Sequence, residues 1–187
     1  MNLGIRSMNK REGDWILTYT NKRFYALDPQ PDDIDIRDIA RALSMTCRFS
    51  GHVNAFYSVS QHSVLVSKLV PSDLALTALL HDAAEAYLTD IPTPIKRNMG
   101  MAKEYAAMED KILEAVMKKY GGIFPLPDEV EYVDHNIVGT EAIELFNEFP
   151  DWVLDRNLNI FDVPIRPMMP DEAERLFLER FYQLCGG

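Results

Sequence analysis

The stretch LLHDAAEAYLTDIPTPIK, residues 79–96, decides how this chain is interpreted. It begins as an apolar helix, yet it carries His81 and Asp82 side by side, followed by Glu85 and Asp90. In a helix, residues three and four apart share one face, so His81, Asp82 and Glu85 are expected on one arc of surface. Apolar neighbours turn that arc toward the interior, where such a cluster is costly to desolvate. A bound divalent cation is the simplest compensation.

Two residues elsewhere in the chain extend this pattern. His62 precedes His81 by nineteen residues, on the preceding predicted helix, and Asp134 lies on the apolar face of a later one. Two imidazoles and two carboxylates suit zinc, cobalt, manganese or iron, with positions left for water and substrate. Magnesium could join through substrate phosphates. The alternative is that His81 is an ordinary core histidine and that Asp82 and Glu85 face solvent.

The composition narrows the classes of function. A formal net charge of −10 disfavours nucleic-acid binding and a surface for anionic lipid, because binders of polyanions display a basic face. Cys47 and Cys185 form no CxxC pair, which disfavours a disulfide scaffold or a zinc ribbon. No apolar run approaches membrane-spanning length, so we expect no membrane association and a cytoplasmic location. The length of 187 residues predicts one domain over residues 1–187.

The hydrophobic periodicity predicts an all-α fold with a short N-terminal β-hairpin. Alternating apolar and polar residues predict the hairpin at residues 15–27, and a helical core is expected over residues 35–185. Helix starts are predicted where a residue can cap the backbone N–H groups, namely at Asp35, Ser58 and Asp171. The predicted helices between these starts run from about residue 72 to the Asp90-Ile91-Pro92 break, from 102 to 120, and from 127 to about 146–149.

Taken together, these residues resemble the HD-domain phosphohydrolases, whose signature is H…HD…D. The matching positions are His62, His81, Asp82 and Asp134. The segment HDAAEAYLTDIPTPIK resembles bacterial HD-domain 5′-deoxynucleotidases. The upstream segment DIDIRDIARALSMTCRFSGHVNAFYSVSQHSVLVS is more similar to phage and bacterial HD phosphohydrolases that include the phage dATP triphosphohydrolases. The resemblance covers roughly residues 15–185 and implies a compact HD-domain helical bundle.

The resemblance also implies roles for residues of the site. His62, His81, Asp82 and Asp134 would be the metal ligands. Glu85 would act as general acid or orient the attacking water.

Asp90, the second acidic residue of the pair, would hold water, substrate or a further metal ion. Arg48 would meet phosphate, and Lys96 could add a positive charge. Phe49 stands where the deoxynucleotidases have tryptophan, so their selection of sugar and base does not carry over, and His52 could touch substrate. For Glu141, a structural ion pair with an arginine is expected.

The implied function is hydrolysis of a small-molecule nucleotide by a homo-oligomer. Our first expectation is a dNTP triphosphohydrolase, of the dATP type, which releases deoxynucleoside and triphosphate. The alternative is a 5′-deoxynucleotidase, which releases deoxynucleoside and phosphate from a dNMP. A cyclic-nucleotide phosphodiesterase is less favoured, because the additional histidines of many such enzymes have no counterpart here. An alternative of another class is a non-catalytic HD module that binds a nucleotide or a protein.

Overall fold

A short β-hairpin precedes the helices. The computed structural model describes residues 11–98 and 100–186, and in it β1 (Ile16–Leu17) pairs with β2 (Arg23–Phe24) in antiparallel register. Phe24 is fully buried, and its ring stacks on that of Tyr87 with 3.7 Å between ring centroids. The hairpin therefore packs on the helical core through an aromatic pair, as a hairpin of this size is marginal alone.

The predicted all-α class with a short hairpin is confirmed. The 3₁₀ turns are η1 (Pro31–Asp33) and η2 (Arg48–Gly51). The α-helices are α1 (Ile36–Met45), α2 (Val59–Leu69), α3 (Ala75–Leu80), α4 (Glu85–Leu88), α5 (Thr93–Asn98), α6 (Ala102–Tyr120), α7 (Asp128–Leu145), α8 (Trp152–Asp155) and α9 (Pro170–Cys185).

Two helices begin at the caps that the sequence predicts. The Asp35 carboxylate accepts a hydrogen bond from the backbone N–H of Arg37, which opens α1. Ser58 and Gln61 form a reciprocal capping box, in which each side chain accepts from the backbone N–H of the other. Helix α2 therefore starts at Val59, which places His62 in its first turns.

The prediction of one continuous helix from about residue 72 to residue 90 was wrong. Helix α3 ends at Leu80, α4 begins at Glu85, and the turn between them uses tighter hydrogen bonds from residue i to residue i−3. The N–H of Ala83 donates to the Leu80 carbonyl, and that of Glu85 to the Asp82 carbonyl, both at 3.0 Å. Such 3₁₀ geometry rotates consecutive side chains differently from an α-helix. It sets how His81 and Asp82 project.

The C-terminal half contains three further differences from the prediction. Helices α5 and α8 lie outside the helix ranges that the sequence predicts. Asp171 does not cap α9, because Pro170 occupies the first helical position and Met169 the cap position. Asp171 instead pairs with Arg41 on α1.

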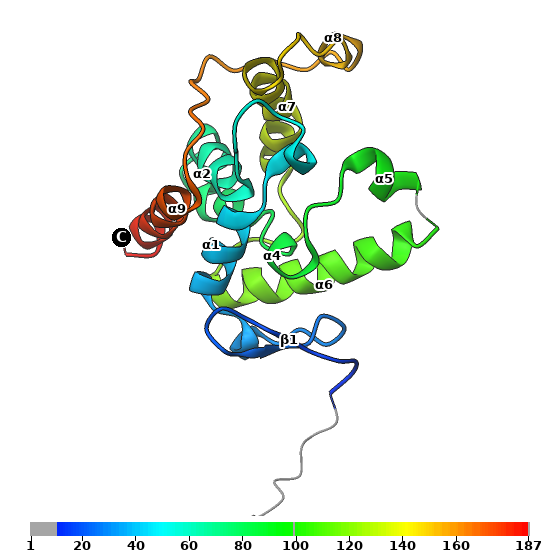
Figure 1. The fold of residues 1–187 in the computed structure, drawn as a ribbon. Coiled ribbons are helices and arrows are strands. Elements are labelled where there is room, and N and C mark those ends of the chain that lie inside the picture. Colours follow the sequence, from blue (N-terminus) through cyan, green and yellow to red (C-terminus); the bar gives the residue numbers. More distant parts are fainter. Residues whose placement is uncertain (1–10, 99, 187) are drawn as a thin grey trace, which may run out of the picture.

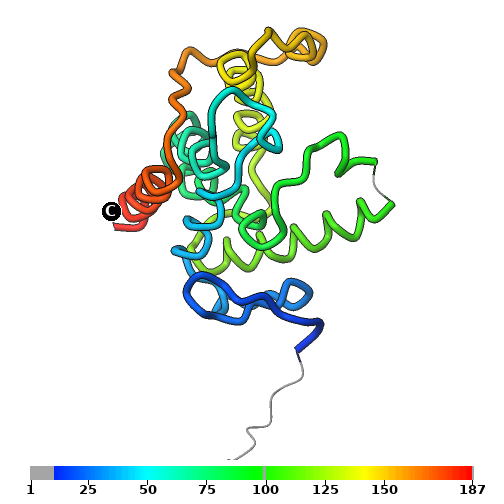
Figure 2. The backbone as a smooth tube through the Cα atoms, viewed as in Figure 1, coloured from blue at the N-terminus to red at the C-terminus, as the bar shows by residue number. Residues whose placement is uncertain are grey.

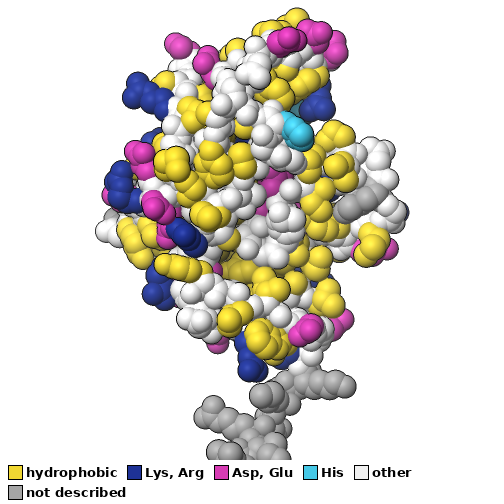
Figure 3. Space-filling model, viewed as in Figure 1, with side chains coloured by type: hydrophobic (Ala, Val, Ile, Leu, Met, Phe, Trp, Pro, Cys, Tyr) yellow, Lys and Arg dark blue, Asp and Glu magenta, His cyan; other side chains and the backbone are white. Residues whose placement is uncertain are grey.

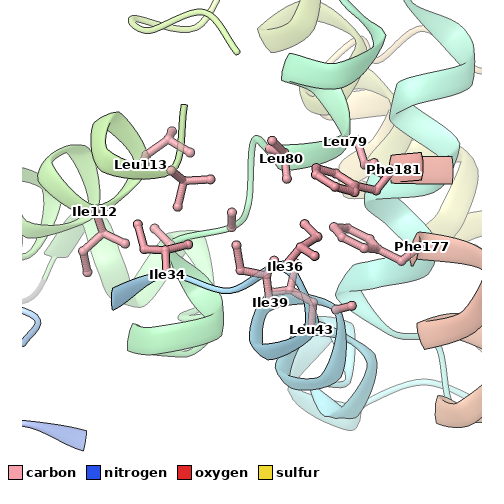
Figure 4. Packing of buried hydrophobic residues seen from close by; sticks show 14 of the residues in the cluster. Ile34, Ile36, Ile39, Leu43, Leu79, Leu80, Ile112, Leu113, Phe177 and Phe181 are labelled. Atoms are coloured by element: carbon pink, nitrogen blue, oxygen red, sulfur yellow. The ribbon is translucent and has the colours of Figure 1, made fainter. Parts of the chain in front are cut away.

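The helices pack around a core shared by the hairpin and both halves of the chain. Helix α9 packs against α1 and α2, and α2 also packs against α3 (Figure 1). Figure 4 shows Phe177 and Phe181 of α9 pointing toward residues of α1 and α3. A second buried cluster, which includes Val66, Val133 and Ile137, joins α2 to α7. These contacts bring α2, the α3–α4 segment and α7 together.

The hairpin and helices α7 and α8 lie at opposite ends of the molecule (Figure 2). Figure 2 traces the chain from the hairpin (blue) at one end of the molecule to α7 and α8 (yellow to orange) at the other. Within the described residues, no helix combines the length and apolar character needed to cross a membrane.

Candidate metal centre and active site

Four predicted ligands from three parts of the fold come together. His62 lies on α2, His81 and Asp82 follow α3, and Asp134 lies on α7. The Nε2 atom of His62 is 2.9 Å from Asp134 Oδ1 and 3.6 Å from Asp82 Oδ2. That of His81 is 3.3 Å from Asp82 Oδ2 and 3.4 Å from Asp134 Oδ1. The structure thus assembles the predicted two-histidine, two-aspartate cluster.

Both imidazoles turn the same nitrogen toward the centre of the cluster. The Nδ1 atom of His62 lies 2.8 Å from Glu141 Oε1, and that of His81 lies 2.7 Å from the carbonyl oxygen of Ala78. A carboxylate and a carbonyl can only accept, so each Nδ1 carries the hydrogen. In the neutral rings, both Nε2 atoms then present lone pairs, 3.3 Å from each other. Two lone pairs at this distance repel unless a proton or a metal ion lies between them.

The spacing of the ligand atoms around the two imidazole nitrogens fits a divalent metal ion. Two atoms each about 2.1 Å from one ion lie about 3.0 Å apart at a right angle and about 3.4 Å apart at the tetrahedral angle. The five distances that involve an imidazole Nε2 atom run from 2.9 to 3.6 Å. His62 and His81 are buried, whereas the Asp134 side chain is 42% exposed. The centre is therefore enclosed on the histidine side and open toward solvent on the Asp134 side.

Charge–charge interactions shift the pKa values of the cluster. Burial lowers the pKa of His81, but the carboxylates of Asp82 and Asp134 outweigh it and raise that pKa well above its ordinary value. Burial raises the pKa of Asp134, but hydrogen bonds to both imidazoles bring it well below its ordinary value. The carboxylates thus stabilise positive charge at the imidazole nitrogens, and a metal ion would displace a proton from them when it binds.

Glu85 and Asp90 extend the acidic surface beside the cluster. Burial, followed by the charges of Asp82 and Asp90, raises the pKa of Glu85 well above its ordinary value. Its Oε2 atom is buried and has no hydrogen-bond partner among the described residues. Burial also raises the pKa of Asp90. Acidic side chains lie recessed among neutral and apolar ones near the middle of the face in Figure 3.

Arg48 is the basic side chain at the cluster. Its backbone N–H donates to the carbonyl of Tyr57, which fixes the start of η2. The guanidinium Nη2 lies 3.0 Å from Glu141 Oε2, and Nη1 lies 3.8 Å from Asp82 Oδ2. Its Nε is buried without a hydrogen-bond partner in the described part of the chain. The predicted ion pair of Glu141 with an arginine is therefore observed, and the arginine is Arg48.

The other predicted substrate residues differ in their surroundings. Phe49 has φ 55°, its ring meets that of Phe146 edge-on at 5.2 Å, and the Arg48 guanidinium lies 5.6 Å from its centroid. His52 is exposed, and its backbone N–H donates to the Phe49 carbonyl. Lys96 pairs with Glu109 of α6. A phosphate contact by Lys96 would require it to leave that pair.

The sequence interpretation missed the contact between Glu141 and His62. Glu141 was expected to form an ion pair only. Its spacing from Asp134, seven residues and about two helical turns, was the available signal, because it puts both carboxylates on one face of α7. Only the packing of α7 on α2 shows that this face meets His62.

Comparison with known proteins shows which family the chain belongs to. Residues 48–130 match the model of the 5′-deoxynucleotidase YfbR-like family. The chain is 40% identical over 172 residues to the uncharacterized protein YfdR of Escherichia coli K12, which covers 91% of this chain and 95% of YfdR. It is 34% identical over 194 residues to an uncharacterized protein of Rhodobacter capsulatus, with coverage of 91% and 95%.

A third relative carries a functional name. The 5′-deoxynucleotidase YfbR of Escherichia coli O127:H6 is 43% identical over 67 residues, 33% of this chain and 34% of YfbR. The fold, the His and Asp cluster and these matches define an HD-domain phosphohydrolase. The chain belongs to the family that includes YfdR. The resemblance to HD-domain 5′-deoxynucleotidases is confirmed, whereas these relatives do not show one to phage dATP triphosphohydrolases.

Proposed function

We propose that the protein is a 5′-deoxynucleotidase, which hydrolyses a deoxynucleoside 5′-monophosphate to deoxynucleoside and phosphate. The observation that carries this proposal is the match of residues 48–130 to the YfbR-like model. That range contains Arg48, His62, His81, Asp82 and Glu85. The sequence alone favoured a dNTP triphosphohydrolase over a 5′-deoxynucleotidase, and the family match favours the 5′-deoxynucleotidase.

The cluster of His62, His81, Asp82 and Asp134 would hold the divalent ion. The distances from the two Nε2 atoms to both aspartates support this assignment, and nitrogen with carboxylate oxygen suits zinc, cobalt, manganese or iron. When bound, such an ion polarises a phosphoryl oxygen and makes water a better nucleophile. The two histidines and two aspartates would orient it, and Asp134 lies on the side open to substrate.

Arg48 would bind the phosphate group of the substrate. Its guanidinium is held beside Asp82 by Glu141, while its Nε is not used by the described residues. A guanidinium presents parallel N–H groups that match phosphate oxygens. Phe49 lies next to it and would form part of the wall on which the nucleoside rests.

Glu85 would donate a proton to the leaving O5′ atom. Water attacks phosphorus, the P–O5′ bond breaks, and the departing oxygen needs one proton to become the hydroxyl group of the nucleoside. The raised pKa of Glu85 supports this role, because it lets the carboxyl group keep a proton at a higher pH than an ordinary glutamate does. Asp90 would hold water or the sugar nearby.

Charge balance favours a monophosphate over a triphosphate. Among the described residues, Arg48 is the one lysine or arginine that forms an ion pair with a carboxylate of the cluster. Lys96 is paired with Glu109. A triphosphate brings more negative charge than a monophosphate to an already acidic surface. Arg48 and Lys96 offset little of that charge.

Product analysis tests the proposal. Metal-stripped protein is reloaded separately with cobalt, manganese, zinc or magnesium and incubated with ribo- and deoxynucleoside mono-, di- and triphosphates, with Asp82→Ala as control. We expect nucleoside and phosphate from dNMPs. Release of triphosphate from a dNTP would establish the triphosphohydrolase instead. No turnover above the Asp82→Ala control with any ion would make a nucleotide- or protein-binding role the leading hypothesis.

A further inference from the structure

Glu141 is a fully buried carboxylate in the middle of α7, with 0% exposure. An ionised carboxyl group in such a place is strongly destabilising unless it is paired and hydrogen-bonded. Its position therefore needs an explanation beyond packing. The proposed hydrolysis uses this residue only to hold the guanidinium of Arg48.

Three residues from two other segments contact this carboxylate. Its Oε1 accepts a hydrogen bond from Nδ1 of His62 at 2.8 Å and from the Tyr57 hydroxyl at 3.1 Å. Its Oε2 lies 3.0 Å from Nη2 of Arg48, an ion pair without hydrogen-bond geometry, and has no hydrogen-bond partner among the described residues. Arg48 offsets the charge of Glu141, and that charge in turn makes the bond from His62 stronger than a neutral one.

The bond determines which nitrogen of His62 faces the cluster. A carboxylate accepts only, so the hydrogen stays on Nδ1 and the Nε2 lone pair points at the ligand atoms of His81 and Asp134. His81 reaches the same state through a backbone carbonyl, that of Ala78. His62 depends instead on a side chain, which substitution can remove.

We infer that Glu141 is a positioning residue, which holds His62 in the tautomer and orientation that bind the divalent ion. The inference rests on the metal cluster of the proposed function. Outer carboxylates that orient a metal-binding histidine typically contribute about ten- to a hundredfold to metal affinity. Glu141 touches neither the ion nor the substrate, and acts through His62.

Glu141→Gln is the sharpest test, because it keeps size and removes charge. The amide offers one acceptor oxygen and one donor nitrogen, so it can satisfy His62 or Arg48 but not both. Co²⁺ is titrated into metal-stripped wild type, Glu141→Gln and Glu141→Asp, and binding is followed by the visible absorbance of cobalt. We expect the Kd for Co²⁺ to rise about ten- to a hundredfold in Glu141→Gln. Glu141→Asp should recover part of the loss.

Asp38→Asn is the matched control for a structural effect. Asp38 is 3% exposed and accepts hydrogen bonds from the backbone and hydroxyl of Thr20, far from the ligand atoms in sequence. Its substitution should lower the melting temperature and leave the Co²⁺ affinity unchanged. Circular dichroism shows whether each variant is folded before titration.

No nucleotide enters this test, so its outcome is separate from that of the proposed function. A Glu141→Gln protein that is folded and binds Co²⁺ as tightly as wild type overturns the inference. An equal loss in Asp38→Asn, or no Co²⁺ binding by wild type, overturns it as well. A weakened Glu141→Gln beside a wild type that hydrolyses no nucleotide would refute the nucleotidase proposal alone.

Discussion

The Nε2 atoms of His62 and His81 lie 3.3 Å apart, although each ring donates its Nδ1 hydrogen to another group. Both Nε2 atoms therefore point toward one position, and a cation at that position would remove the repulsion between their lone pairs. This position is the centre of the site.

Removal of the metal ion should destabilise the protein. An ion at 100 times its Kd adds about 2.7 kcal/mol to the free energy of unfolding, which for a chain of this size corresponds to about 5–11 °C. We expect the melting temperature to fall by that amount on dialysis against a chelator and to recover on addition of Co²⁺ or Zn²⁺. Identical melting curves with and without metal would contradict the cation site.

Glu85→Gln should slow the release of a poor leaving group more than that of a good one. Loss of a general acid costs about 10²–10⁴ in rate, so kcat for a dNMP should fall by that factor. The phenolate of p-nitrophenyl phosphate leaves without protonation, so its hydrolysis should fall far less in the same variant. Steady-state kinetics give kcat of wild type and Glu85→Gln for both substrates. Equal losses would assign Glu85 to orienting the water.

Arg48→Lys should impair substrate use and spare the metal ion. Lysine keeps a positive charge beside Glu141 but lacks the planar fork, and a hydrogen bond to a charged group contributes about 1.5–3 kcal/mol. We therefore expect kcat/KM for a dNMP to fall about 10- to 150-fold. Co²⁺ titration of the same protein should give the wild-type affinity. Full activity in Arg48→Lys would exclude a fork-like phosphate contact.

The cap of α1 should give an acid-sensitive increment of stability. Hydrogen bonding from Arg37 outweighs burial and lowers the pKa of Asp35 below its ordinary value of 3.8. A carboxyl group whose pKa is lower in the folded state than in the unfolded state stabilises the protein at pH values above its unfolded-state pKa. This stabilisation is lost as the pH falls from the unfolded-state pKa through the folded-state pKa. The melting temperature of wild type should therefore exceed that of Asp35→Asn at about pH 5–7, and the gap should shrink toward about pH 3.

Asp35→Ala separates the cap from its charge. Loss of an N-cap costs about 0.5–2 kcal/mol, whereas asparagine still caps. Asp35→Ala should thus be less stable than Asp35→Asn at every pH in urea unfolding. If the two variants unfold at the same urea concentration, the side chain does not act as a cap.

Local sequence patterns predicted the elements that depend on near neighbours. Periodicity and caps predicted α1, α2, α6 and α7, because helix formation depends on residues three and four apart. Alternation of apolar and polar residues predicted the hairpin. The same spacing predicted that His81, Asp82 and Glu85 belong together. It did not predict the 3₁₀ turn between α3 and α4, where a continuous apolar pattern hides a change in hydrogen bonding.

The sequence by itself determined which residue types are available to hold a cation, and in which helices they lie. Only the tertiary structure decided their partners. Glu141 meets His62 across 79 residues of chain and also pairs with Arg48, and Lys96 pairs with Glu109 of α6. These choices depend on how the helices pack, because a long charged side chain can reach several partners and periodicity does not specify which. The tautomer of His62, and with it the direction of its lone pair, follows from that packing.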